Sequence, residues 1–326
     1  MKIPVRFLAL FACALLALCA EGVSGQSKTA AAADQKQLVL LDTDIGDDID
    51  DAFALGLLLQ GSEVKLLGIS TAYGDTELRA RLVDRYLAAV GRTDIPVAAG
   101  VRTATPPSNV FTQAAYAHRE PERKHRDGVA LLLDEARRHP GEVTLIAIGP
   151  LGNVKAAIAR DPETFHKLKR VVIMGGSVDR GYGKPGTPPQ VEWNAGQDPE
   201  GLRALLNSGV PVFVMPLDST QIPLPEEEQD RLFAFGSALT DQITVLYHQW
   251  KYLSGWHPTG PVLYDPVAVT YALKPEVCPA KPLRLDVDDK GMTRPVEGAP
   301  NAEVCLKADE RGFLDFLSSR IAPAKK

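Results

Sequence analysis

The sequence predicts an α/β fold with a single open, mostly parallel sheet and helices on both of its faces. Six short apolar runs rich in β-branched residues recur along the 326 residues, and segments with the apolar spacing of helices separate them. Alternation of strand and helix favours parallel strands with helices packed on both sides. The sequence has no internal repeat and no interdomain linker, so a single folded domain is expected.

The first 25 residues have the features of a cleavable signal peptide. Two basic residues precede an apolar run over 7–19, and small residues lie just before Gln26. We therefore expect export to a periplasm or to the exterior, with no membrane attachment once the signal is removed. A retained membrane anchor is not expected, because the apolar run is too short to span a bilayer. A lipoprotein signal is the alternative, although Leu18 stands before Cys19, where that signal needs a small residue.

The folded domain is expected to follow a flexible lead-in. Residues 26–37 are polar and rich in Ala, and the domain is expected over 38–326. Its first six strands are predicted at 38–42, 64–71, 95–100, 143–149, 170–176 and 210–218. Helices are predicted after the first two strands, where Leu57 and Leu82 belong to apolar positions with helical spacing.

The last third of the chain is predicted to be mainly helical, with two strands added late. Residues 223–260 are mostly helical by pattern, and further helices are predicted at 265–273 and 309–321. Residues 283–288 and a few residues near Val304 are expected to be antiparallel strands.

The charge of the chain argues against nucleic acid as a partner, and its cysteine pattern argues against a zinc site. The chain has 36 Lys and Arg against 41 Asp and Glu, a net charge of −5, and no basic run that would follow a phosphate backbone. Nucleic acid is therefore not an expected partner. After cleavage two cysteines remain, Cys278 and Cys305, which an oxidising compartment allows to pair and which otherwise would be buried thiols. Neither belongs to a Cys/His cluster of the kind that binds zinc.

An acidic cluster follows the first predicted strand, at the edge of the sheet where such folds bind ligands. Six aspartates lie within ten residues around Gly46, namely Asp42, Asp44, Asp47, Asp48, Asp50 and Asp51. Carboxylates this close raise one another's pKa values, and a hard divalent cation with oxygen ligands relieves the repulsion. Calcium or magnesium is the expected ion. The alternative is a solvated turn in which Asp50 and Asp51 only cap the next helix.

The sequence resembles the nucleoside hydrolase family of the inosine-uridine-preferring type. That family opens with a strand and then Asp-x-Asp-Pro-Gly-x-Asp-Asp-Ala, which Asp42-Thr43-Asp44-Ile45-Gly46 and Asp50-Asp51-Ala52 match with two extra residues between them. Later matches follow in the family's order over 38–273. They are Tyr73-Gly74-Asp75, IPVAAG at 95–100, IGPLGN at 148–153, IMGGS at 173–177, Glu192-Trp193-Asn194 and Asp265-Pro266.

The resemblance implies the fold of that family and a role for each matched residue. The calcium ligands would be Asp44, Asp51, the carbonyl of Ile148, and Asp265, and Asp50 would be the general base that activates water. The ribose would be held by Asp75, Met174, Glu192 and Asn194. Counting from Asp44 without a gap selects Asp48 as the base instead, whereas anchoring on the start of the helix selects Asp50.

Two departures from the family pattern affect the predicted site. Asp75 replaces an Asn that the family uses near the ribose, which adds a negative charge. Tyr264 stands where the family often has a His that protonates the departing base, and a phenol with an ordinary pKa near 10 is a poorer acid at neutral pH. Trp256 and His257 are further candidates for contact with the base.

The predicted function is calcium-dependent hydrolysis of the N-glycosidic bond of ribonucleosides, which releases free base and ribose. The substrate would be a small nucleoside. Members of the family often form oligomers, so the resemblance also implies a dimer or tetramer. Two other functions remain open. A metal-dependent phosphohydrolase would use the Asp42-Thr43-Asp44 motif with magnesium, and a non-catalytic protein would bind a ribosyl ligand in the same site. The preferred base is also left open.

Overall fold

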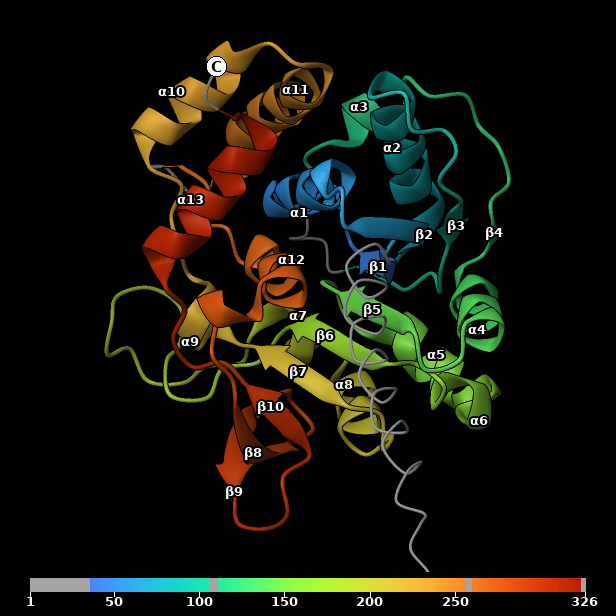
Figure 1. Cartoon of the computed structure of the whole chain (residues 1–326), viewed down its shortest axis with the longest axis vertical. Coiled ribbons are helices and arrows are strands. Elements are labelled where there is room, and N and C mark those ends of the chain that lie inside the picture. The colour runs from blue at the N-terminus through green and yellow to red at the C-terminus, as the bar shows by residue number, and fades with distance from the viewer. Residues whose placement is uncertain (1–35, 106–110, 256–259, 324–326) are drawn as a thin grey trace, which may run out of the picture. The chain divides into compact units, whose positions relative to one another are not determined.

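The structure is a computed structural model that describes residues 36–105, 111–255 and 260–323 (Figure 1). The predicted signal peptide, most of the lead-in, and both Trp256 and His257 lie outside these residues. The described chain forms one ten-stranded sheet in the order β4-β3-β2-β1-β5-β6-β7-β10-β8-β9. The central position of β1 and β5 places the segments that follow them in the middle of one edge of the sheet.

The sheet is parallel from β4 to β10 and antiparallel at its far end. The first six predicted strands and both late strands are confirmed, but β10 pairs parallel with β7, so only its pairing with β8 is antiparallel as expected. The strands are β1 (Gln37–Thr43), β2 (Val64–Thr71), β3 (Val97–Ala99), β4 (Arg126–Asp127), β5 (Val143–Ala147), β6 (Arg170–Met174), β7 (Val212–Met215), β8 (Lys281–Val287), β9 (Thr293–Val296) and β10 (Ala302–Val304).

Helices cover both faces of the sheet, as predicted. One buried cluster joins the sheet to α1, α2, α11, α12 and α13, and a second joins its other face to α4, α5, α6 and α8. The helices are α1 (Asp50–Gln60), α2 (Thr76–Ala89), α3 (Ala114–Ala117), α4 (Gly128–Arg138), α5 (Gly152–Arg160), α6 (Pro162–Phe165), α7 (Trp193–Gln197), α8 (Pro199–Leu206), α9 (Leu217–Thr220), α10 (Glu226–Phe235), α11 (Ala238–Leu253), α12 (Asp265–Leu273), the 3-10 turn η1 (Pro275–Val277) and α13 (Glu310–Ile321).

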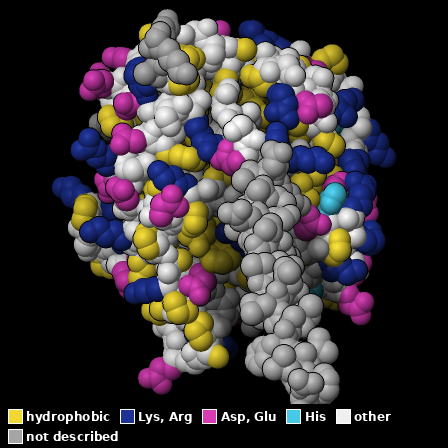
Figure 2. All heavy atoms as spheres, in the orientation of Figure 1, with side chains coloured by type: hydrophobic (Ala, Val, Ile, Leu, Met, Phe, Trp, Pro, Cys, Tyr) yellow, Lys and Arg dark blue, Asp and Glu magenta, His cyan; other side chains and the backbone are white. Residues whose placement is uncertain are grey.

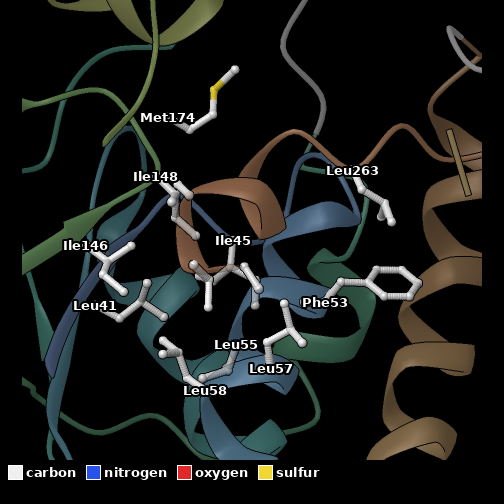
Figure 3. Packing of buried hydrophobic residues seen from close by; sticks show 14 of the residues in the cluster. Leu41, Ile45, Phe53, Leu55, Leu57, Leu58, Ile146, Ile148, Met174 and Leu263 are labelled. Atoms are coloured by element: carbon white, nitrogen blue, oxygen red, sulfur yellow. The ribbon is translucent and has the colours of Figure 1, made fainter. Parts of the chain in front are cut away.

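The first of these clusters supports the segment that carries the acidic residues. Figure 3 shows Leu41, Ile45 and Ile148 among the apolar side chains that pack there, and all three are buried. Strands covered on both faces read as continuous apolar runs, which is why β1 was recognisable from its sequence. Within the described residues, no helix is long and apolar enough to cross a membrane.

A disulfide joins Cys278, which follows η1, to Cys305, which follows β10. The pairing closes a segment with a sequence separation of 27 residues. We expect Cys278→Ser combined with Cys305→Ser to lower the free energy of unfolding by about 3 kcal/mol, because the open chain gains conformational entropy. Urea denaturation of the protein without residues 1–25 measures this difference, and reduced wild-type protein is the matched control. Equal stability of the oxidised and reduced proteins would contradict the prediction.

Candidate functional site

A cavity of about 430 Å³ lies beyond the carboxyl ends of β1, β5 and β6. Its floor is acidic, and its walls come from segments far apart in the sequence. The lining residues are Asp44, Asp47, Asp48, Asp50, Asp51, Ile148, Met174, Tyr182, Glu192, Trp193, Asn194, Tyr264 and Asp265. Eight of the nine residues predicted for the site are among them, so the fold assembles the predicted site almost completely.

The pairing of β1 with β5 places the first acidic residues beside Ile148. Asp42 is in register with Ala147, and the backbone N–H of Ile148 donates to the Asp42 carbonyl at 2.8 Å. Asp44 then lies against the backbone of Gly149, where a Cβ atom would come within 2.7 Å of Asp44 Oδ1. The absence of a side chain at Gly149 therefore gives the Asp44 carboxylate its place in the cavity.

Three carboxylates converge at the N-termini of two helices. Asp50 and Asp51 begin α1 and Asp265 begins α12, and an oxygen atom from each lies within 4.8 Å of the others. The backbone N–H of Asp265 donates to Asp50 Oδ2 at 3.0 Å, and the Thr43 hydroxyl donates to Asp51 Oδ1. Positive ends of both helix dipoles thus face the same carboxylates and offset part of their repulsion.

Burial raises the pKa values of these acids. It raises the pKa of Asp44 to about 8, and the charges of Asp47 and Asp50 add to the effect while Arg79 opposes it. Burial likewise raises the pKa of Asp48 to about 7 and those of Asp50, Asp51 and Asp265 well above their usual range. A divalent cation would favour the ionised forms. Three buried carboxylates and the carbonyl of Ile148, a residue that also lines the cavity, are hard oxygen donors of the kind that such an ion takes.

The opposite wall is built around the start of α7. Glu192 caps this helix, because its side chain accepts from the backbone N–H groups of Asn194 at 2.8 Å and Ala195 at 3.0 Å. It also accepts from Gly176 at 2.9 Å, just after β6. The Asn194 amide donates to the carbonyls of Ile148 and Met174, each at 3.2 Å. These bonds hold the polar side chains of α7 against the ends of β5 and β6.

Asp75 lies elsewhere. Its carboxylate caps α2 by accepting from the backbone N–H of Leu78 at 3.2 Å, and it pairs with Arg102 at 3.0 Å. Asp75 is not among the residues that line the cavity. This position gives no support to the predicted ribose contact. The reason is physical: an Asp directly before a helix is a strong N-cap, and a nearby guanidinium draws its second oxygen toward solvent.

The helix anchor of the acidic motif agrees with the structure. α1 begins at Asp50, as the Asp-Asp-Ala match predicts, and the two extra residues lie in the preceding turn. The alternative base, Asp48, also lines the cavity, where it accepts from the backbone N–H of Ile49 at 2.7 Å and from the Trp250 side chain. The geometry differs from the predicted roles in one respect. Asp50, rather than Asp44, is grouped with Asp51 and Asp265.

Aromatic side chains close part of the cavity, and the sequence indicated only some of them. Tyr182 and Tyr264 make an edge-to-face contact with ring centroids 6.2 Å apart, and the backbone N–H of Trp193 donates to the Tyr182 hydroxyl at 2.9 Å. Trp193 stands inside a matched motif, and Tyr264 occupies the position of the family's His. No local pattern marks Tyr182, which comes from the long segment between β6 and α7.

Arg79 is a second residue that the sequence did not single out. It lies on α2, is only 1% exposed, and forms an ion pair with Asp47 at 2.8 Å. Its charge lowers the pKa values of Asp44 and Asp51. A buried arginine at a helical position next to apolar residues has no distinguishing signal in the sequence, because only the fold reveals that acids face it.

The chain matches known proteins over most of its length. The profile of the family described as inosine-uridine preferring nucleoside hydrolase matches residues 39–315. The pyrimidine-specific ribonucleoside hydrolase RihA of Citrobacter koseri is 30% identical over 310 residues, which cover 87% of this chain and 97% of that protein.

Solved structures show the same fold. A plant nucleoside hydrolase, PpNRh1, superposes with a TM-score of 0.78 at 25% identity, over 88% of this chain and 99% of the other. A purine-preferring ribonucleoside hydrolase from Gardnerella vaginalis superposes with a TM-score of 0.73 at 23% identity, over 88% and 98% of the two chains.

On the face shown in Figure 2, acidic and basic side chains are intermixed.

Proposed function

We propose that this chain, which belongs to the inosine-uridine preferring nucleoside hydrolase family, hydrolyses the N-glycosidic bond of ribonucleosides. The reaction would take place in its acidic cavity with the help of a calcium ion. The observation that carries this proposal is the convergence of the buried carboxylates of Asp50, Asp51 and Asp265 within 4.8 Å, inside a cavity whose opposite wall offers Glu192 and Asn194. In the reaction, water adds to C1′ of the sugar, the bond to the base breaks, and the base takes up a proton.

The ion would be held by Asp50, Asp51 and Asp265, with the carbonyl of Ile148 as a further oxygen donor. All four lie in the cavity lining, and the three carboxylates are almost fully buried. When bound, a calcium ion would orient the attacking water and the sugar hydroxyls and increase the acidity of that water. Calcium suits this set better than zinc because every donor is an oxygen atom.

Asp44 is the carboxylate best placed to take the proton from water. One oxygen of Asp50 is occupied by the Asp265 N–H, and one oxygen of Asp51 by the Thr43 hydroxyl. Among the described residues, the Asp44 carboxylate accepts only from its own backbone N–H, and it lines the cavity beside the three grouped acids. A general base needs an available lone pair within reach of the reacting water. We therefore assign to Asp44 the role that the family resemblance gave to Asp50.

Glu192 and Asn194 would bind the ribose hydroxyls from the opposite wall. Their backbone and side-chain bonds fix them in place before substrate arrives, which reduces the entropy lost on binding. Met174 lies beside them at the end of β6 and would pack against the sugar ring. Carboxylates accept strong, directional hydrogen bonds from a diol.

Tyr264 lines the cavity, and its hydroxyl would contact the departing base. Burial raises its pKa, and the charges of Asp48 and Asp50 raise it further, so the phenol stays protonated at neutral pH. It can therefore donate a hydrogen bond to a base nitrogen, although it is a weak proton donor in the Brønsted sense.

The direct test is ribose release from a panel of purine and pyrimidine nucleosides by the protein without residues 1–25. We expect release in the presence of calcium and its loss after chelation, and the best substrate identifies the preferred base. Phosphate release from phosphorylated compounds, or binding of nucleosides without turnover, would refute the proposal. The curated relative acts on pyrimidine nucleosides by name, while one structural neighbour prefers purines, so the panel needs both.

We also propose that residues 1–25 direct export and are then removed. The Cys278–Cys305 disulfide supports this proposal, because disulfides persist in oxidising compartments. N-terminal sequencing of the exported protein should find Gln26 as the first residue. Protein retained in the cytoplasm with its first residues intact would refute it.

A further inference from the structure

The turn between β1 and α1 is two residues longer than the family motif to which the sequence was matched, and it must still present its acids to the cavity. Gly46 lies in the middle of this turn with φ +128°, a backbone conformation that favours glycine. A Cβ atom at Gly46 would come within 1.9 Å of the Phe111 ring. The turn is therefore packed tightly against a neighbouring segment, and its shape depends on contacts from outside.

Arg79, from α2, donates several of the hydrogen bonds that hold this turn. Its Nη1 donates to the carbonyl of Asp44 and, at 3.1 Å, to that of Ile45, while Nη2 donates to Asp47 Oδ2 at 2.8 Å. Its Nε donates to the carbonyl of Tyr73 at 2.8 Å. One guanidinium thus links the turn after β1 to the turn after β2.

Donors from the segment before α3 hold the rest of the turn. The backbone N–H of Gln113 donates to the Gly46 carbonyl at 3.0 Å, and the Thr112 hydroxyl donates to the Asp47 carbonyl at 2.8 Å. The Gln113 side chain donates to the carbonyl of Asp48 at 2.8 Å. Every carbonyl from Asp44 to Asp48 therefore has a donor outside the turn, which fixes the peptide planes and with them the directions of the side chains.

We propose that Arg79 is a positioning residue for the reaction: it holds the extended turn so that the Asp44 carboxylate faces the cavity. The inference rests on the proposed function. Arg79 does not line the cavity, so it acts through the backbone of the turn and not on the substrate. Its acceptors lie in different directions, and the planar, five-donor guanidinium matches them in a way that an ammonium group does not.

Two possible roles of Arg79 predict opposite changes in calcium affinity when the residue is replaced. If Arg79 supplied only positive charge, its removal would tighten calcium binding, because a cation near the ion repels it. If it positions the turn, its removal should weaken calcium binding and slow the reaction, since the acids lose their arrangement. The variants Arg79→Met and Arg79→Lys separate these cases, because lysine restores the charge without the planar fork.

The matched control is Arg81→Met on the same helix. Arg81 also binds a backbone carbonyl and a carboxylate, with Nη2 at 2.6 Å from the Glu120 carbonyl and Nη1 at 2.9 Å from Glu122, but these contacts lead away from the cavity. All variants are compared for kcat and KM at saturating calcium, for calcium affinity by titration calorimetry, and for melting temperature. Assays are run well below the melting temperature of each protein.

We expect Arg79→Met and Arg79→Lys each to lower kcat by about 10- to 100-fold with little change in KM, the loss typical of small misplacement of reacting groups. Calcium should bind about tenfold more weakly to both variants. Arg81→Met should leave kcat and calcium affinity within about twofold of wild type. Near-normal kcat in either Arg79 variant, or tighter calcium binding in Arg79→Met, would overturn the proposal.

The design separates failure of this inference from failure of the proposed function. If the wild-type protein releases no ribose from any nucleoside, the proposed function fails, and calorimetry with calcium still tests Arg79. If Arg79→Met does not fold, Arg79→Lys decides the question, because it keeps the charge and most of the volume of the side chain.

Discussion

Asp44→Asn is expected to lower kcat for ribose release by about 10²- to 10⁴-fold, the usual contribution of a general base. The amide keeps the size and shape of the side chain beside Gly149, so the packing of the turn is preserved. It cannot accept a proton from water at neutral pH. The measurement is steady-state kinetics at saturating calcium on the best nucleoside of the panel, with calcium affinity determined in parallel.

The comparison that decides the assignment is Asp50→Asn. Asp50 belongs with Asp51 and Asp265, so this variant should weaken calcium binding, and raising the calcium concentration should restore much of its kcat. Asp48→Asn tests the ungapped alignment and should retain most of its activity. If Asp50→Asn lost its kcat at saturating calcium while Asp44→Asn did not, the base would be Asp50, as the family resemblance first indicated.

Calcium is expected to raise the melting temperature by about 5 °C or more at pH 8, when present at 100 times its dissociation constant at that pH, and the same calcium concentration is used at every pH. The effect should shrink toward pH 5. The cause is the raised pKa of the buried acids, about 8 for Asp44 and about 7 for Asp48, against values near 4 in the unfolded chain. The metal-free fold binds more protons than the unfolded chain between these limits, so it is most stable at low pH and loses stability as the pH rises through the folded pKa values.

The difference between calcium-loaded and chelated protein isolates this contribution. His125, which lies between Glu77 and Asp84, has a raised pKa and also loses stabilising charge as the pH rises. It lies outside the cavity and should contribute equally with and without calcium. Melting curves at pH 5, 6, 7 and 8 in both conditions therefore give the pH dependence of the acidic site by subtraction. A calcium effect that is the same at pH 5 and pH 8 would show that the acids are already ionised in the metal-free protein.

Several residues of the cavity were recognisable because their signal is local. The six aspartates lie within ten residues after a continuous apolar strand, and Glu192 and Asn194 stand two positions apart in a short motif. Parallel strands bring their carboxyl ends to one edge of the sheet, so residues that follow β1, β5 and β6 were expected to meet. The cavity lining confirms that they do.

Asp75 is the predicted ribose contact that the cavity lining leaves without support. Its place after β2 matched the motif, but the carboxylate binds the start of its own helix and Arg102 instead of facing the cavity. The change from Asn to Asp alters the preferred partners of the side chain, because a carboxylate has no donor of its own and seeks N–H groups and cations. A motif position therefore did not determine the direction of the side chain.

The sequence by itself determined the fold class, the first, central strands of the sheet and the acidic cluster, while it left the state of the two cysteines open. These follow from periodicity and from residues close together in the chain, where the backbone alone sets the geometry. Only the tertiary structure decided that Asp50 joins Asp265, 215 positions away, that Tyr182 faces Tyr264, and that buried Arg79 holds the acidic turn. Such contacts depend on how helices pack on the sheet, and packing is set by the whole core rather than by any single segment.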